Sequence, residues 1–191
     1  APTTTFNPNV DYGDSDNDVR HIIAGAVTYQ IPSAGTSGMG HALLSGWSVD
    51  GLFNARSATP VFILGGSVSS GGVVWAPRPN VIPGVPVYLY GSQYPGGMRL
   101  NPAAFSNPGP TQGNLERNSI RGFGAWQVDL AVHRQFQLSK AVGLQLRAEV
   151  FNVLDHVNFG PPASSGAANN SITSPTFGIA TQTLASSLGG L

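Results

Sequence analysis

The chain has 191 residues and a formal net charge of zero, because 9 Lys and Arg balance 9 Asp and Glu. Zero net charge without a basic run argues against nucleic-acid binding. The absence of cysteine excludes disulfides and thiolate metal sites. Charged residues make up only 9%, where a soluble domain carries about a quarter, and hydrophobic residues only 41%. The surface is therefore expected to carry either uncharged polar groups facing water or apolar groups facing lipid.

Four segments alternate apolar and polar residues with the two-residue period of a β-strand. They run from about Val19 to Ile31, Leu43 to Ala58, Trp126 to Leu138 and Leu144 to Leu154. Each is at least as long as the ~9 to 11 residues with which a tilted strand crosses a bilayer. Gly and Pro interrupt nearly every helical window. The fold class predicted is all-β, as an antiparallel transmembrane β-barrel segment.

The connections between these segments alternate in length. Residues 32–42 and 139–143 form short turns, whereas residues 65–124 and 157–177 form long stretches rich in Gly, Pro and Asn. Short turns on one side and long loops on the other are typical of outer-membrane barrels. We therefore expect an open, curved antiparallel sheet of about four long strands, with two poorly ordered long loops.

Side-chain parity predicts how the strands around the 139–143 turn face each other, because a one-residue slip would turn the apolar set inward. Even positions are expected to face even positions, with Leu138 opposite Leu144. The further predicted pairs are His133 with Glu149, Gln135 with Arg147, and Val132 with Val150. Arg134 interrupts the apolar face and is expected near the periplasmic end, where its side chain extends toward lipid headgroups.

Six charged or titratable residues fall on the polar faces of the predicted strands, which face the lumen in a large barrel. We expect them to satisfy one another by pairing rather than to bind a specific ligand. These predicted lumen-facing residues are Asp50, Arg56, Asp129, His133, Arg147 and Glu149.

No metal site or cofactor site is predicted. Asp11, Asp14, Asp16 and Asp18 have a spacing that suggests calcium, but Val19 stands where an EF-hand needs Gly and no Glu follows at the required position. A solvated extracellular loop is the favoured interpretation. The four histidines are scattered, at His21, His41, His133 and His156.

No enzyme is predicted either, because the chain has no nucleophile elbow, zinc-protease helix or phosphate-binding loop. Three tyrosines of the long loop fit two interpretations equally well, namely contact with a solute or polymer and anchoring at the membrane interface. They are Tyr88, Tyr90 and Tyr94.

Four phrases, found in family order, resemble the Oar-like barrel region of TonB-dependent transporters, a family common in acidobacterial genomes. They are DVRH at 18–21 with YQIP at 29–32, LSGWSVDG at 44–51 with SATP at 57–60, NPAAF at 101–105 with GNLERNSIRG at 113–122 and DLAV at 129–132, and LRAEVFNVLDHVNFG at 146–160. Phe177 to Thr181 also resembles the approach to the last strand of that family.

The resemblance implies that residues 1–191 are the C-terminal part of a barrel domain, with the plug domain and the closing strand outside the chain. It implies a location in the outer membrane and a barrel-wall role in uptake of an unidentified solute. The implied partners are outer-membrane lipid, the rest of the barrel, the plug and the TonB system. The alternative is a secreted all-β adhesion or carbohydrate-binding module. Expressed alone, the open sheet is expected to aggregate through its unpaired edges.

Overall fold

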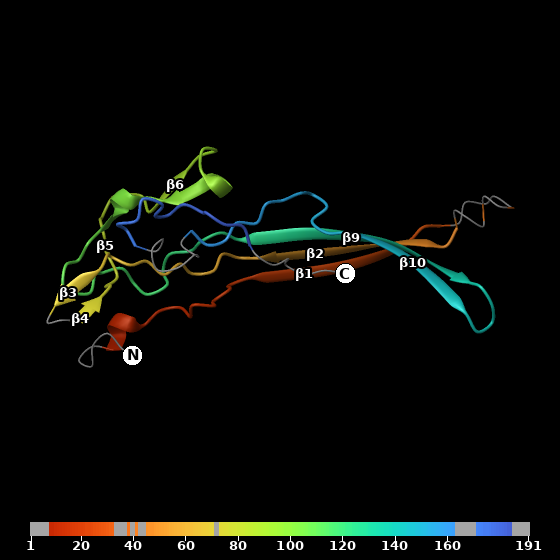
Figure 1. Ribbon diagram of the computed structural model, residues 1–191, viewed down its shortest axis with the longest axis horizontal. Helices are drawn as coiled ribbons and strands as arrows, with labels where there is room; N and C mark the ends of the chain where they lie inside the picture. Colours follow the sequence, from red (N-terminus) through yellow and green to blue (C-terminus); the bar gives the residue numbers. More distant parts are fainter. Residues whose placement is uncertain are drawn as a thin grey trace. The chain divides into compact units, whose positions relative to one another are not determined.

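A computed structural model describes residues 8–32, 38, 41, 45–70, 73–162 and 171–184. The chain divides into two compact units. We call residues 21–56, 126–156 and 186–191 the strand unit, and residues 1–20, 57–125 and 157–185 the loop unit. Figure 1 shows the long strands of the first and the short elements of the second.

The strand unit is one open four-stranded sheet with the order β1-β2-β9-β10. Its strands are β1 (Ile22–Gln30), β2 (Trp47–Arg56), β9 (Ala125–Gln137) and β10 (Gly143–Val150). β1 and β2 are antiparallel, as are β9 and β10. The predicted all-β class is therefore confirmed, and the strands lie within the predicted segments to a few residues. The predicted start of the second strand at Leu43 lies outside the described residues.

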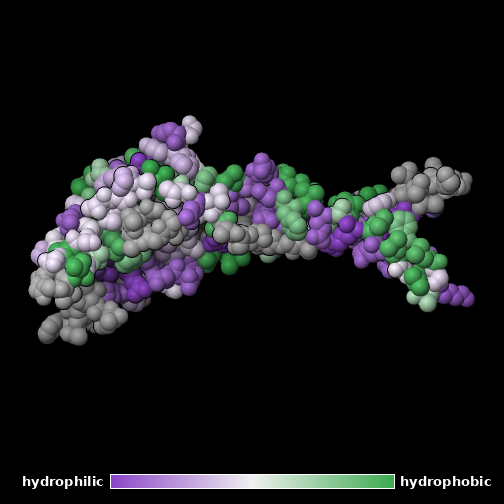
Figure 2. All heavy atoms as spheres, in the orientation of Figure 1, coloured by the Kyte–Doolittle hydropathy of each residue, from purple (hydrophilic) through white to green (hydrophobic). Residues whose placement is uncertain are grey.

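The two faces of this sheet differ in polarity. β1 carries Ile23, Val27 and Tyr29 at odd positions, and these side chains are 59% to 66% exposed. The register with β2 pairs odd with odd positions, so Phe53 lies on the same face. Figure 2 shows hydrophobic spheres along the strands. A sheet that exposes one apolar face is suited to contact with lipid.

The β9–β10 hairpin keeps the predicted parity but not the predicted register. Val132 lies opposite Ala148 and His133 opposite Arg147, so the predicted pairs are wrong by two residues. The turn is tighter than expected, because the Leu138 and Ser139 amides both donate to the Val142 carbonyl. Val142 therefore extends the hairpin instead of belonging to the turn.

β10 also ends earlier than predicted, at Val150 rather than Leu154. Asn152 and Asp155 have positive φ values of 50° and 48° and form a turn there. The Asn152 side chain stabilises this turn, since its amide donates to the His156 carbonyl at 3.0 Å and its oxygen accepts from the His156 amide at 3.1 Å. Asn is well suited to such positions because its short side chain bonds the local backbone.

The loop unit consists of short elements. Its 3-10 turns are η1 (Pro8–Asp11), η2 (Pro95–Gly97) and η3 (Pro102–Ala104). Its strands are β3 (Val68–Ser70), β4 (Val73–Trp75), β5 (Asn80–Val81), β6 (Tyr88–Tyr90), β7 (Met98–Leu100) and β8 (Phe105–Ser106). They form three two-stranded antiparallel pairs, β3 with β4, β5 with β8 and β6 with β7. Within the described ranges, no helix is long and apolar enough to cross a membrane.

A hydrophobic core holds the loop unit together. Phe177 is fully buried, and its ring meets the edge of Phe105 at a centroid distance of 5.6 Å. Gly178 lies so close to Leu100 that an added Cβ would stand 2.6 Å from the Leu100 carbonyl oxygen. The core residues are Val61, Ile63, Leu100, Ala104, Phe105, Leu115, Ile120 and Phe177. The expectation of two poorly ordered long loops is therefore wrong for their described parts, because apolar residues from both loops share this core.

Candidate functional site

Four of the six predicted lumen-facing residues gather on the polar face of the sheet. With Thr28 they form what we call the polar cluster, which comprises Thr28, Asp50, His133, Arg147 and Glu149. The Asp50 carboxylate accepts from the Thr28 hydroxyl at 2.8 Å and lies 2.9 Å from His133 Nδ1. Arg147 Nη1 lies 3.8 Å from the same carboxylate, and Arg147 Nε also donates to Glu149.

The other two predicted residues lie apart from the polar cluster. Arg56 is the last residue of β2, opposite Ile22. Asp129 is 1% exposed, and its Oδ1 accepts from Gln127 Nε2 at 2.6 Å and from the Asn152 amide at 2.8 Å. Asp129 therefore fixes the turn after β10 against β9. Asp129 is buried because of the turn at Asn152, which the alternation of apolar and polar residues did not predict.

The polar cluster is built for mutual neutralisation. One carboxylate, Asp50, receives a hydroxyl, an imidazole and a guanidinium, and a second carboxylate, Glu149, shares that guanidinium. Among the described residues, no group of three or more His, Asp or Glu side chains has a metal-binding arrangement. The arrangement supports the expected pairing of wall charges along one face of the sheet.

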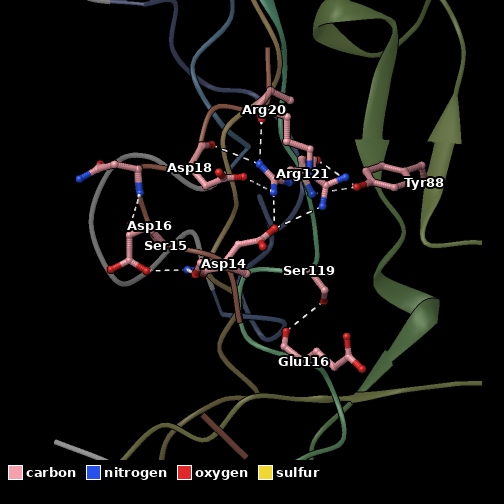
Figure 3. Close-up of polar contacts among 12 residues, drawn as sticks. Asp14, Ser15, Asp16, Asp18, Arg20, Tyr88, Glu116, Ser119 and Arg121 are labelled. Carbon is pink, nitrogen blue, oxygen red and sulfur yellow. Dashed lines mark hydrogen bonds and ion pairs between the residues drawn. The ribbon is translucent and has the colours of Figure 1, made fainter. Parts of the chain in front are cut away.

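The aspartates of the 11–18 segment in the loop unit bond to arginines. Asp11 accepts from the buried Arg78 at 3.0 Å. Figure 3 shows the Arg121 guanidinium directed at both Asp14 and Asp18. We call these residues, with Asp16, Arg20, Arg117 and Asn118, the aspartate–arginine cluster. The carboxylates dock the 11–18 segment onto residues 78 and 117–121, while the Asp14 and Asp16 side chains stay 41% and 69% exposed, as the interpretation of a solvated loop expects.

Asn118 has a central place in this docking. It adopts a positive φ of 56°, and its side-chain amide donates to the Asp14 carbonyl at 2.8 Å and to Asp16 Oδ1 at 2.6 Å. The hydrogen bond from Asn118, followed by that from Arg117, lowers the pKa of the Asp16 carboxyl below its ordinary value. Gly13 forms a parallel bridge with Arg117, where an added Cβ would stand 2.3 Å from the Arg117 carbonyl oxygen. The close approach therefore requires glycine.

Tyr88 completes the surroundings of Arg121. Its hydroxyl donates to the Arg121 carbonyl and accepts from the Arg121 amide, both at 3.0 Å. Burial raises the pKa of the Tyr88 phenol, so it stays protonated and keeps both bonds. Burial alone would lower the pKa of the Arg121 guanidinium, but its bonds to Asp18 and Asp14 outweigh burial and raise that pKa. This buried framework is structural in character.

The three tyrosines that fitted two interpretations have different environments. Tyr88 is half-buried against the core and bonds to Arg121, whereas Tyr90 is 72% exposed. The Arg99 guanidinium lies 5.8 Å from the centre of the Tyr94 ring. Of these three, Tyr90 is the one whose ring is available for contact with a solute or interface.

The histidines do not converge. His133 belongs to the polar cluster, and His156 stacks on Trp126 at a centroid distance of 4.1 Å. His21 precedes β1, and His41 is exposed, with its carbonyl accepting from Ser45.

Sequence reasoning missed the arginines that hold the loop unit. Arg78, Arg117 and Arg121 lie 67, 101 and 107 residues from their aspartates. The alternate spacing of Asp14, Asp16 and Asp18 indicated that their carboxylates cluster. No nearby residue indicated that arginines would be their partners. Such long separations leave no local pattern.

The comparisons with known proteins agree with this geometry. A family model described as an outer membrane beta barrel domain matches residues 1–187. The chain belongs to this outer membrane beta barrel family. Its location is the outer membrane, and the strand unit contributes to the barrel wall. No curated protein and no solved structure matches the chain significantly.

Proposed function

We propose that the chain is a wall segment of a TonB-dependent transporter that takes up a solute across the outer membrane. The observation that carries the proposal is the polar cluster, in which Asp50, His133 and Arg147 pair on the face opposite the exposed apolar residues. A barrel that is wide enough to enclose a plug lines its lumen with such polar side chains. The quoted phrases at 18–21, 44–51, 113–122 and 146–160, which resemble Oar-like transporters, support the same proposal.

In this proposal the chain carries out no chemical step. Asp50, Arg56, His133, Arg147 and Glu149 line the passage or contact the plug, whereas the buried Asp129 holds the turn after β10. The partners are outer-membrane lipid, the remainder of the barrel, a plug domain and the TonB system. The family match gives no support to the alternative of a secreted adhesion or carbohydrate-binding module.

The test uses the full-length protein in a Gram-negative host. Site-directed photo-crosslinking from its periplasmic face should capture the C-terminal domain of TonB. The yield of this crosslinked product should be higher when the host expresses the transporter than when it does not. A matched host that lacks TonB provides the control. A barrel that folds normally but never crosslinks to TonB would refute the transporter proposal and leave only its place in the outer membrane.

A further inference from the structure

Arg99 differs from the other arginines of the loop unit in its charge balance. Each of the others forms an ion pair with an aspartate of the 11–18 segment, and these paired arginines are Arg20, Arg78, Arg117 and Arg121. Among the described residues, no Asp or Glu lies within ion-pair distance of Arg99, whose hydrogen bonds go only to backbone carbonyls. Its positive charge is therefore not neutralised within the described part of the chain.

Two carbonyl groups fix the direction of the Arg99 guanidinium. Its Nε donates to the Leu100 carbonyl at 3.2 Å, and its Nη2 donates to the Phe177 carbonyl at 2.9 Å. The Phe177 carbonyl can approach this closely because Gly178, with a φ of 75°, lies against Leu100 without a side chain. The backbone of the folded loop unit therefore sets the position of this cation.

The Tyr94 ring supports the same guanidinium. The guanidinium carbon of Arg99 lies 5.8 Å from the centre of that ring, within the range of cation–π attraction. The tip of the β6–β7 hairpin (Figure 1) holds Tyr94, because its amide donates to the Gly91 carbonyl at 3.1 Å and its carbonyl accepts from the Gly97 amide at 2.9 Å. A ring against the face of a guanidinium leaves the edges, which carry the N–H groups, to other partners.

Arg99 keeps hydrogen-bond donors that no described residue uses. Of the five N–H groups of a guanidinium, the two carbonyls take one on Nε and one on Nη2, which leaves the second N–H of Nη2 and both of Nη1. Nη1 is not buried, so solvent reaches it. Nη1 and Nη2 form a fork that matches two oxygens of one carboxylate or phosphate.

We propose that Arg99, supported by Tyr94, is a binding site for the carboxylate or phosphate group of a small extracellular solute. Arg99 belongs to the long connection 57–125, and the long connections of outer-membrane barrels face the exterior. A charge-assisted hydrogen bond to an anion is about twice as strong as a bond between neutral groups. The site is independent of the transporter proposal, because a barrel with another role would carry the same loop unit.

The experiment measures the binding of matched sugars to detergent-solubilised full-length protein by saturation-transfer NMR. Glucuronate carries a carboxylate, glucose phosphate carries a phosphate, and glucose is the neutral control. An anionic sugar should bind about tenfold more tightly than glucose, and Arg99→Gln should remove this advantage, because hydrogen bonds to a charged group are lost. Arg20→Gln is the matched control and should leave binding unchanged, since Arg20 is 63% exposed in the same unit but already pairs with Asp14.

The tighter of the two anionic sugars identifies carboxylate or phosphate as the group that Arg99 binds. Equal binding of glucose, no binding of either anionic sugar, or equal binding to wild type and Arg99→Gln would overturn the proposal. Limited proteolysis within residues 57–125 reports whether each variant keeps the loop unit folded. If Arg99→Gln does not, Arg99→Lys takes its place and should weaken binding several-fold, because lysine keeps the charge but lacks the fork. Unchanged binding in that variant would equally overturn it. None of these outcomes depends on TonB.

Discussion

The two units of the chain place apolar residues in opposite environments. In the strand unit, Ile23 and Val27 are more than 60% exposed, while Gln127 and Asp129 are buried. In the loop unit, Ile63, Leu100 and Phe177 are buried. A unit that folds in water hides apolar groups, whereas one that meets lipid exposes them and covers its polar groups. Each unit is therefore adapted to a different solvent, within a chain that carries few charges overall.

The largest expected effect concerns which solvent, lipid or water, contacts each face of the sheet. In the full-length protein in membranes, Val132→Cys and Val150→Cys should react with lipid-soluble maleimides. His133→Cys and Glu149→Cys should react with water-soluble ones, because they lie on the polar face. The reverse labelling pattern would show that the two faces have been assigned the wrong way round.

The hairpin register can be tested as an all-or-none result. Val132 and Ala148 are directly opposite, so Val132→Cys with Ala148→Cys should form a disulfide on oxidation. Val132→Cys with Val150→Cys should not, since Val150 pairs with Leu130. Mobility on non-reducing gels gives the readout. Efficient crosslinking of the 132–150 pair alone would restore the register expected from the sequence.

A core substitution should affect the loop unit more strongly than any surface change. Phe177→Ala should lower the free energy of unfolding of that unit by about 3 to 5 kcal/mol, because a buried ring is lost and a cavity remains. Phe62→Ala is the matched control, since Phe62 is 43% exposed, and should cost less than about 1 kcal/mol. Pulse proteolysis across a urea gradient, scored for cleavage within residues 57–125, measures both. Similar losses from the two variants would argue against a packed core.

The aspartate–arginine cluster should contribute less than the core. Arg121→Met removes bonds to Asp14 and Asp18 and should cost about 2 kcal/mol. Arg20→Met removes an exposed partner of the same Asp14 and should cost under about 1 kcal/mol. Hydrogen exchange of the amides at 13–18 reports the docking of this segment. If the two variants cost the same, burial of Arg121 has no energetic importance.

The smallest predicted effect is a dependence on pH. The pKa of Asp16 is lowered in the folded protein by its bonds from Asn118 and Arg117, so its contribution to stability is complete above the unfolded pKa of about 4. That contribution is lost as the pH falls from there through the folded pKa. Exchange at residues 13–18 should accelerate over this range, and Asp16→Asn should show a weaker acceleration. An identical pH profile in the two proteins would remove Asp16 from the explanation.

Sequence alone determined the strands of the sheet and the composition of its faces, because a two-residue period repeats along each strand wherever the two sides meet different solvents. It also brought Asp50, His133, Arg147 and Glu149 onto one side. A family resemblance supplied the membrane setting, which periodicity and strand length also favoured. These features follow from the local sequence pattern, so they can be predicted without knowledge of distant contacts.

Only the tertiary structure decided the rest. A shift of two residues leaves parity intact, so the pattern could not separate Val132 opposite Ala148 from Val132 opposite Val150, and the turn at Leu138 and Val142 chose between them. The core around Phe177 and the pairing of Arg121 with Asp14 join residues 72 and 107 positions apart. Contacts of that separation depend on how the whole chain packs, and Gly, Pro and Asn-rich segments carry no periodic signal that foretells them.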